Sequence, residues 1–253
     1  MEILDTVFKH RSIRDFKDET LSEETLETLY KSAIAVSTST SSQACSIIHV
    51  SDPNIKNEVS KVSRQEFIAK APHLFIFAVD NYRNKSIAEE SGVKQTYASS
   101  MDLFFQGFSD ACIMAQTMAL VAQSMGLGIC LLGSILNNPE RICELLKMPQ
   151  LTFPAIGLVV GKPSDKVIYQ KPRLDFSMRV FENEYKVYDD YLSEIAEYND
   201  EIAQYFIKRN DASSGSQYRN DFVKVVISRL KKDYPSRRKI LEFARKQGFE
   251  VEL

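Results

Sequence analysis

The sequence of 253 residues contains no tryptophan, three histidines and four cysteines. The missing tryptophan has no functional meaning, but the scarcity of histidine and cysteine does. No CxxC pair occurs and no spacing of these residues matches a metal site, so we expect no bound metal. The cysteines lie in apolar or helical surroundings, which predicts buried free thiols in a reducing compartment, the cytoplasm. They are Cys45, Cys112, Cys130 and Cys143.

The sequence also has no large excess of positive or of negative charge. The sequence has 32 lysines and arginines against 34 acidic residues, which gives a formal net charge of −2. Nucleic-acid-binding domains are usually strongly basic, so we expect no nucleic-acid partner.

Neither a secretory signal nor a membrane span is evident. The amino terminus, MEILDTVFKH, is acidic and amphipathic, unlike a signal peptide. The most apolar long segment, 101–125, contains polar side chains throughout, which is typical of a buried core helix rather than of a span. These polar residues are Asp102, Gln106, Asp110, Gln116 and Gln123. We therefore expect no membrane partner.

Glycine-rich nucleotide loops are also absent. No GxxxxGK[ST] loop occurs, and the Gly126-Leu127-Gly128 element precedes a predicted strand instead of linking a strand to a helix, so it is not a dinucleotide fingerprint. The hydrophobic fraction of 44% and the charged fraction of 26% are ordinary for a globular protein. The length allows one large domain or two small ones.

The sequence does contain a series of apolar strands and long helices. Apolar runs predict four strands, over 45–50, 74–79, 126–134 and 153–161, of which the second is buried on both faces. Periodic segments predict helices over 54–62, 98–125, from 138 onward, 189–208, 220–233 and 236–247. Residues 81–94 predict a loop or a mobile helix. The pattern indicates an α+β or mixed α/β sheet covered by helices.

A further helix is expected after Ser22, which can cap its amino terminus. Its apolar positions repeat at helical spacing and predict one buried stripe, formed by Leu26, Leu29, Tyr30, Ala33 and Ile34. The charged carboxy-terminal helices fit an arm that packs on the body, a solvated excursion, or an element that embraces a second subunit. Arg209 to Gln217 predicts a flexible loop between them.

The segment Lys9–Phe16 (KHRSIRDF) places two arginines, a histidine and a hydroxyl within five positions. Guanidinium groups beside a hydroxyl and backbone N–H groups suit a phosphate or another polyoxygen anion. A solvated basic turn is the alternative interpretation. The distant run Lys171-Pro172-Arg173 favours the anion site, because its cations lie in a predicted loop and the proline limits their separation.

Seven small polar residues follow one another from Ser37 to Gln43, between a predicted helix and a predicted strand. Such a run is either a flexible connector or a loop placed to donate hydrogen bonds to a ligand. The residues alone leave both interpretations open.

Taken together, HRSIRDF, the Ser/Thr/Gln run, the GLG-to-LLGS segment and the KPR run resemble the FMN-dependent nitroreductase superfamily. The resemblance keeps the order and approximate spacing of the motifs over nearly the whole chain. It is closest to the branch of oxygen-insensitive NADPH nitroreductases and NADPH–flavin oxidoreductases. It implies a nitroreductase-like α+β fold with a central, mostly antiparallel sheet. It also implies one domain over 1–253, a helical carboxy-terminal excursion over 188–253, and a homodimer with FMN at its interface.

The resemblance further implies which residues bind FMN. The amino-terminal motif would hold the phosphate and the ring edge through His10, Arg11, Ser12 and Arg14. The hydroxyl loop would contribute Ser37, Thr38 and Ser39, and a partner-facing glutamine corresponds to Gln65. The segment before the 138 helix would contribute Leu131, Leu132, Gly133 and Ser134, and the KPR run would place Lys171 and Arg173 at the phosphate.

Two positions depart from the family pattern. Ser134 stands where relatives often have a second glycine, and Leu136 stands where some have an arginine. Both departures leave the substrate preference open, while FMN binding is expected to survive them.

The activity implied is an NAD(P)H oxidoreductase, preferring NADPH, that reduces nitroaromatics, quinones or free flavin by ping-pong hydride transfer. We expect no acid–base catalytic residue, because hydride transfer depends on stacking distance and orientation. Arg209 is expected to bind the 2′-phosphate of NADPH, unless it only complements the dipole of a helix end. A non-catalytic flavin- or nucleotide-binding sensor is the alternative function, and a phosphate-binding protein without flavin is a third.

Overall fold

The computed structural model describes residues 2–166, 168–211 and 221–250. The chain forms two compact units. The first comprises Met1–Asp165 with Tyr234–Leu253, and the second comprises Lys166–Asp233.

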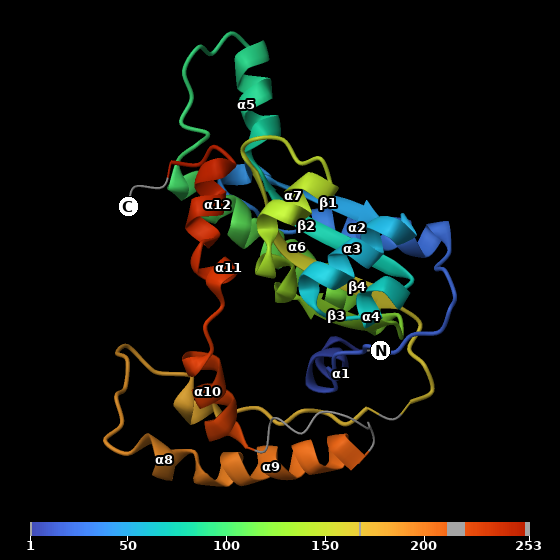
Figure 1. Ribbon diagram of the computed structural model, residues 1–253, viewed down its shortest axis with the longest axis vertical. Helices are drawn as coiled ribbons and strands as arrows, with labels where there is room; N and C mark the ends of the chain where they lie inside the picture. The colour runs from blue at the N-terminus through green and yellow to red at the C-terminus, as the bar shows by residue number, and fades with distance from the viewer. Residues whose placement is uncertain (1, 167, 212–220, 251–253) are drawn as a thin grey trace. The chain divides into compact units, whose positions relative to one another are not determined.

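A four-stranded antiparallel sheet forms the centre of the first unit (Figure 1). Its strands are β1 (Cys45–Val50), β2 (His73–Asp80), β3 (Gly128–Leu132) and β4 (Thr152–Gly161). The spatial order is β1-β2-β4-β3, so β3 lies at an edge. All four strand predictions are confirmed, and β2 is buried along its length up to Asp80.

A register shift interrupts the pairing of β2 with β4. Phe77 pairs with Ile156, whereas the next residue, Ala78, pairs with Pro154. A proline cannot donate to a strand ladder and is tolerated inside a sheet at such a bulge. The bulge therefore explains how β4 keeps a proline in the interior of the sheet.

Helices surround this sheet in the first unit. They are α1 (Ile3–Phe8), α2 (Glu23–Ile34), η1 (Ser39–Ser41), α3 (Pro53–Ser63), α4 (Phe67–Lys70), α5 (Asn81–Glu90), α6 (Met101–Ser124), η2 (Gly133–Asn137), α7 (Pro139–Leu145), α11 (Pro235–Arg238) and α12 (Ile240–Lys246). Of the two predictions for 81–94, the helix is confirmed as α5. Within the described residues, no helix combines the length and apolarity needed to cross a bilayer.

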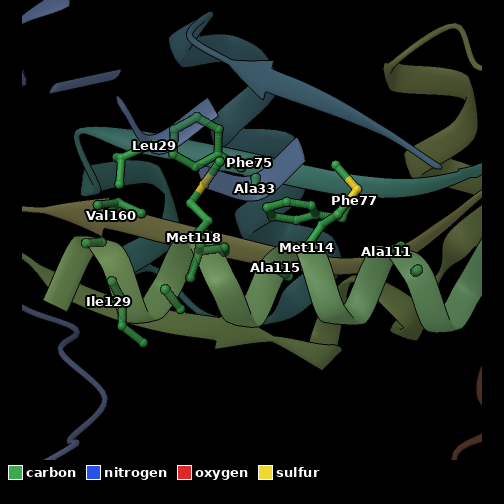
Figure 2. Packing of buried hydrophobic residues seen from close by; sticks show 14 of the residues in the cluster. Leu29, Ala33, Phe75, Phe77, Ala111, Met114, Ala115, Met118, Ile129 and Val160 are labelled. Atoms are coloured by element: carbon green, nitrogen blue, oxygen red, sulfur yellow. The ribbon is translucent and has the colours of Figure 1, made fainter. Parts of the chain in front are cut away.

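Side chains alternate along β2 and so supply a core on each face of the sheet. Phe75 and Phe77 pack against α2 and α6, as Figure 2 shows, together with Met114 and Met118. Leu74 and Ile76 belong to a second buried cluster with residues of α3, α4 and α7. Full burial of each such side chain contributes about 1.5–3 kcal/mol. The sheet therefore lies between two helical layers.

Ser22 caps α2 as predicted, and its hydroxyl accepts the backbone N–H of Thr25 at 3.2 Å. Leu29 and Ala33 are fully buried. The prediction for Ile34 is wrong, because its side chain is 63% exposed. Successive residues are about 100° apart around a helix. Packing is centred on the row from Leu29 to Ala33, so Ile34 at the end of α2 is directed away from it.

The amino-terminal half of α6 lies very close to the start of β1. A Cβ atom on Gly107 would lie 2.6 Å from the carbonyl oxygen of Ala44 and 2.9 Å from a methyl carbon of Val79. Only glycine fits at this distance. The close approach brings the next turn of α6, which contains Asp110, to the loop that precedes β1.

Residues from 234 onward return to the first unit. Phe243 and Phe249 pack in a third buried cluster with Phe104 of α6 and Phe153 of β4. Backbone hydrogen bonds fix the same segment, because the N–H of Leu151 donates to the carbonyl of Gln247 at 2.6 Å. The predicted helix over 236–247 is present, divided at Lys239 into α11 and α12.

The second unit contains η3 (Phe176–Met178), α8 (Tyr191–Glu194), α9 (Ala196–Asp211) and α10 (Phe222–Lys231). The predicted helix over 189–208 is thus divided at Ile195. Helices α9 and α10 pack through Tyr198 and Phe222, whose ring centroids are 5.0 Å apart. Most of the predicted flexible loop, from 212 onward, lies outside the described residues.

A series of hydrogen bonds connects side chains of α2, β1 and β2, namely Tyr30, His49 and His73. The backbone N–H of Leu21 donates to His73 Nε2 at 3.0 Å. His73 Nδ1 lies 3.1 Å from His49 Nε2, and His49 Nδ1 lies 2.8 Å from the Tyr30 hydroxyl. Because His73 Nε2 accepts, His73 Nδ1 must carry the proton and donate to His49. This pattern of hydrogen bonds requires both rings to be neutral.

All four cysteines are free thiols. Cys45, Cys130 and Cys143 are buried, whereas Cys112 is half-buried, so the predicted burial holds for three of the four. Burial raises the pKa of the Cys45 thiol to about 11 and that of Cys143 to about 12, in both cases with help from neighbouring carboxylates.

Candidate functional site

The amino-terminal motif runs beside β3 at the edge of the sheet. Ser12 forms a parallel bridge with Ile129, and the N–H of Ile13 donates to the carbonyl of Ile129 at 2.8 Å. Glycine at position 128 permits this approach, because a Cβ there would lie 2.8 Å from the Ile13 side chain. Backbone pairing and packing therefore fix the motif while Arg11 and Arg14 remain exposed.

Arg14 lies between β3 and α4. Its guanidinium carbon is 6.0 Å from the centroid of the Phe67 ring, within the range of a cation–π contact. Burial raises the pKa of the Cys130 thiol in β3, and the charge of Arg14 and the side chain of Ser12 partly oppose this rise. The charge of Arg14 therefore lies near Cys130 of β3.

His10 is anchored at the other side of the motif. Its Nδ1 atom lies 2.9 Å from Oε1 of Gln123, near the carboxyl end of α6. The imidazole is therefore oriented by the protein before any ligand binds.

Gln65 is held near Arg14 by the end of α3. Arg64 ends that helix in the left-handed conformation, with φ of 54°. The N–H of Gln65 then donates to the carbonyl of Ser60 at 3.1 Å, and the Ser60 hydroxyl donates to the Gln65 carbonyl at 3.0 Å. Since Phe67 contacts Arg14 two residues later, Gln65 belongs to the same neighbourhood as the motif.

The segment before the 138 helix that is predicted to bind FMN follows the end of β3. Leu131 and Leu132 are its last strand residues, and Gly133 and Ser134 begin η2. A Cβ atom on Gly133 would meet no atom within 4 Å, so space is open there. Within the described part of the chain, the buried hydroxyl of Ser134 has no hydrogen-bond partner.

Arg237 fixes this segment from the carboxy-terminal part of the first unit. Its Nε donates to Oδ1 of Asn137 at 3.0 Å, and its Nη2 donates to the carbonyl of Gly133. Sequence reasoning missed this contact, since Arg237 lies in a basic helix where a solvated charge is the ordinary expectation.

The hydroxyl loop lies elsewhere on the chain. The N–H of Ser39 donates to the carboxyl of Asp110, at 3.1 and 3.3 Å from its two oxygens. Asp110 and Gln123, the contact of His10, are 123 − 110 = 13 residues apart on α6. At 1.5 Å per residue these contacts are separated by about 20 Å. One subunit therefore does not bring Ser37, Thr38 and Ser39 to its own amino-terminal motif.

The predicted cations of the second unit lie in two places. Lys171 and Arg173 are in coil as expected, where Nη1 of Arg173 donates to the Lys171 carbonyl at 2.9 Å. The Lys171 ammonium lies 5.9 Å from the centroid of the Phe206 ring. Arg209 is exposed in the last turn of α9.

The donor set fits a phosphorylated aromatic cofactor such as FMN. Exposed guanidinium groups suit a phosphate. The open space at Gly133 suits a planar ring. The first unit thus brings together the motif, Gln65 and the Leu131–Ser134 segment, while the hydroxyl loop stands apart.

Comparison with known proteins gives matches over most of the chain. Residues 7–162 match the profile described as the nitroreductase family, and residues 171–252 match that of the nitroreductase family, C-terminal domain. The chain is 39% identical over 211 residues to the FMN reductase (NADPH) of Bacillus subtilis (strain 168), which covers 82% of this chain and 84% of that protein.

Solved structures are similar over the full length. The NfrA1 nitroreductase from Bacillus subtilis gives a TM-score of 0.88 at 34% identity, covering 98% of this chain and 99% of that one. The NADPH:FMN oxidoreductase from Vibrio harveyi complexed with NAD+ gives a TM-score of 0.82 at 27% identity, covering 98% of each chain.

Proposed function

Because the chain belongs to the nitroreductase family, we propose that it is an FMN-dependent oxidoreductase that prefers NADPH. Its acceptors are nitroaromatics, quinones or free flavin. The observation that carries this proposal is that the amino-terminal motif is held beside β3, the strand that leads into the Gly133–Ser134 corner, while Arg14 also contacts Phe67, two residues after Gln65. The similarity to an FMN reductase (NADPH) supports the choice of cofactor and donor.

When bound, FMN supplies the ring that accepts a hydride from the nicotinamide and passes it on. The protein's own residues bind and orient. Arg11 and Arg14 carry charge that complements the phosphate.

The test is the absorption spectrum of the purified protein, followed by anaerobic titration with NADPH and with NADH. We expect a yellow protein that bleaches with NADPH and recovers its colour when a quinone or a nitroaromatic is added. A flavin that stays oxidised with both nicotinamides would instead identify a flavin-binding sensor. A colourless protein without affinity for FMN would identify a phosphate-binding protein.

The distance between the hydroxyl loop and the amino-terminal motif within one chain supports a homodimer. Ser37, Thr38 and Ser39 lie about 20 Å from the His10 contact along α6, so a second chain must supply this loop if it reaches the flavin. Large apolar side chains are also exposed on α1 and α6, as expected for surfaces that a partner covers. They include Ile3, Leu4, Phe8, Phe105 and Ile113.

The dimer prediction is tested by size-exclusion chromatography with light scattering at micromolar concentration. We expect a mass of about twice the 28.8 kDa of one chain. A monomer that binds FMN and turns over NADPH at the same rate per chain would rule the shared site out.

We propose that the protein is located in the cytoplasm. Four cysteines without a disulfide agree with the reducing environment of that compartment.

Arg209 is proposed to bind the 2′-phosphate of NADPH. Replacing it with alanine should raise KM for NADPH roughly tenfold, as expected for the loss of one charge-assisted contact. KM for NADH and the FMN content should barely change, because only the 2′-phosphate distinguishes the two donors. Steady-state kinetics with both donors measures this.

Lys208 provides the matched control, since it is exposed in the same last turn of α9 and complements the same helix dipole. Lys208→Ala should leave the ratio of the two KM values unchanged. Equal losses with NADPH and NADH in Arg209→Ala would assign the arginine to helix stability.

A further inference from the structure

The hydroxyl loop is held through its backbone by side chains from two helices. Asp110 of α6 accepts the N–H of Ser39. Nδ2 of Asn84 donates to the carbonyl of Ser42 at 2.9 Å, and Nη2 of Arg83 donates to the carbonyl of Gln43. The loop is therefore an anchored structure and differs from the flexible connector that its composition allows.

Its backbone conformation is strained. Thr40, Ser41 and Gln43 have φ of 52°, 58° and 49°, in the left-handed region that non-glycine residues rarely adopt. Strained residues persist only where the surroundings over-determine them, and they gather at ligand-binding sites. The three backbone anchors supply that constraint.

The anchors use none of the three hydroxyls predicted to bind the cofactor. Within the part of the chain that the structure describes, the hydroxyls of Ser37, Thr38 and Ser39 make no hydrogen bond to protein. By contrast, the hydroxyls of Thr40 and Ser42 both donate to the carbonyl of Ser39. The backbone of the loop is thus fixed, while the hydroxyls of Ser37, Thr38 and Ser39 can hydrogen-bond a ligand.

Asp110 is the unusual member of the anchor set. The residue is 2% exposed, in a helix face that otherwise packs in the apolar core. Among the described residues, its carboxyl accepts only the N–H of Ser39. A buried carboxyl with a single donor costs stability compared with an apolar residue. Fold stability therefore does not explain an aspartate at this position.

We propose that Asp110 is a positioning residue for FMN binding. Its carboxyl fixes the Ser39 amide and so directs the hydroxyls of Ser37, Thr38 and Ser39 toward the cofactor. This inference rests on the proposed function, because FMN is the ligand that the loop would contact.

The test compares three variants of the full chain, Asp110→Ala, Asp110→Asn and Asp102→Ala. Asn retains an oxygen that can accept the Ser39 N–H, whereas Ala does not. Asp102 is exposed in the first turn of α6 and accepts a hydrogen bond from Gln106, so it is the matched control. Measurements are the dissociation constant for FMN, the visible circular dichroism of bound FMN, and thermal unfolding of the FMN-free protein.

We expect Asp110→Ala to weaken FMN binding about tenfold, the effect of losing one hydrogen-bond anchor to a charged group. It should also alter the visible circular dichroism, while unfolding of the FMN-free protein shifts little or moves upward. Asp110→Asn should have a dissociation constant for FMN within about threefold of that of the native protein, and Asp102→Ala should have the native value. If the alanine variant does not fold, Asp110→Val, an apolar side chain that also cannot accept the Ser39 N–H, takes its place.

Native and Asp110→Ala proteins that bind FMN with equal affinity would overturn the inference and leave the proposed function intact. Equal loss in Asp110→Ala and Asp110→Asn would also overturn it, since the Ser39 contact would then not be the cause. A native protein without affinity for FMN would overturn the proposed function itself.

Discussion

Arg14→Ala should purify partly colourless, with a dissociation constant for FMN raised by about one to two decades. The reason is electrostatic. The FMN phosphate carries nearly two negative charges, and truncation of one charged partner typically costs about 1.5–3 kcal/mol. Arg14 is fixed over Phe67 and beside β3, so its charge is positioned before the ligand arrives. Fluorescence titration of the FMN-free protein measures the change.

Arg141 supplies a control of the same residue type. It is exposed on α7 and paired with Glu144 at 3.0 Å and Glu58 at 3.5 Å, away from the motif. Arg141→Ala should retain full flavin content. Arg173→Ala, in the second unit, should lose flavin as Arg14→Ala does. Full occupancy and native affinity in both Arg14→Ala and Arg173→Ala would remove these arginines from the phosphate site.

The second large effect expected is a loss of stability between pH 6.5 and about pH 4, caused by the buried histidine pair. His73 is 5% exposed. Burial, then the neighbouring His49 and then the charge of Lys56 lower its pKa from 6.5 to about 4. Burial and the charge of Lys56 also lower the pKa of His49. The hydrogen bond from the Leu21 N–H requires the same neutral state of His73.

The direction follows from proton binding. Between these two pH values the unfolded chain binds a proton at His73 that the folded chain does not, so the free energy of unfolding falls as the pH falls. The stabilisation of the fold by neutral His73 is complete above pH 6.5 and is lost once the pH reaches about 4. A shift of this size corresponds to about 3 kcal/mol.

Urea unfolding of the FMN-free protein at pH 4.5, 5.5 and 7.0 measures this dependence. His73→Gln has no titrating ring and should show a smaller slope of stability against pH, although it is less stable at pH 7. His10→Gln is the control, since His10 lies outside the pair and contacts Gln123. An identical slope in native and His73→Gln proteins would exclude the histidine pair as the cause.

Most of the fold followed from local patterns. Each strand is an apolar run, and Ser22 caps its helix through the predicted side-chain contact. Ile34 was assigned wrongly because helical spacing gives the period of a stripe but not the width of the surface that covers it. The divisions at Ile195 and Lys239 leave no clear mark in a charged, periodic sequence.

The candidate site was predictable in composition and less so in arrangement. The motif, Gln65 and the Gly133–Ser134 corner meet because β3 and the end of α3 bring them together, which no spacing in the sequence states. The roles of Asp110 and Arg237 depend on backbone groups far away in the chain, Ser39 and Gly133. A contact between a side chain and a distant carbonyl or amide leaves no motif to read.

The buried thiols have a consequence for chemical durability. Flavins exchange electrons with oxygen as well as with organic acceptors, so an enzyme of this kind works near peroxide. Peroxide attacks the thiolate, and sulfur oxidation follows thiolate character and exposure. Burial raises the pKa of all four thiols, to about 11 at Cys45 and about 12 at Cys143. The cysteines are therefore kept in the unreactive form, and the protein should survive many turnovers in air without sulfenylation.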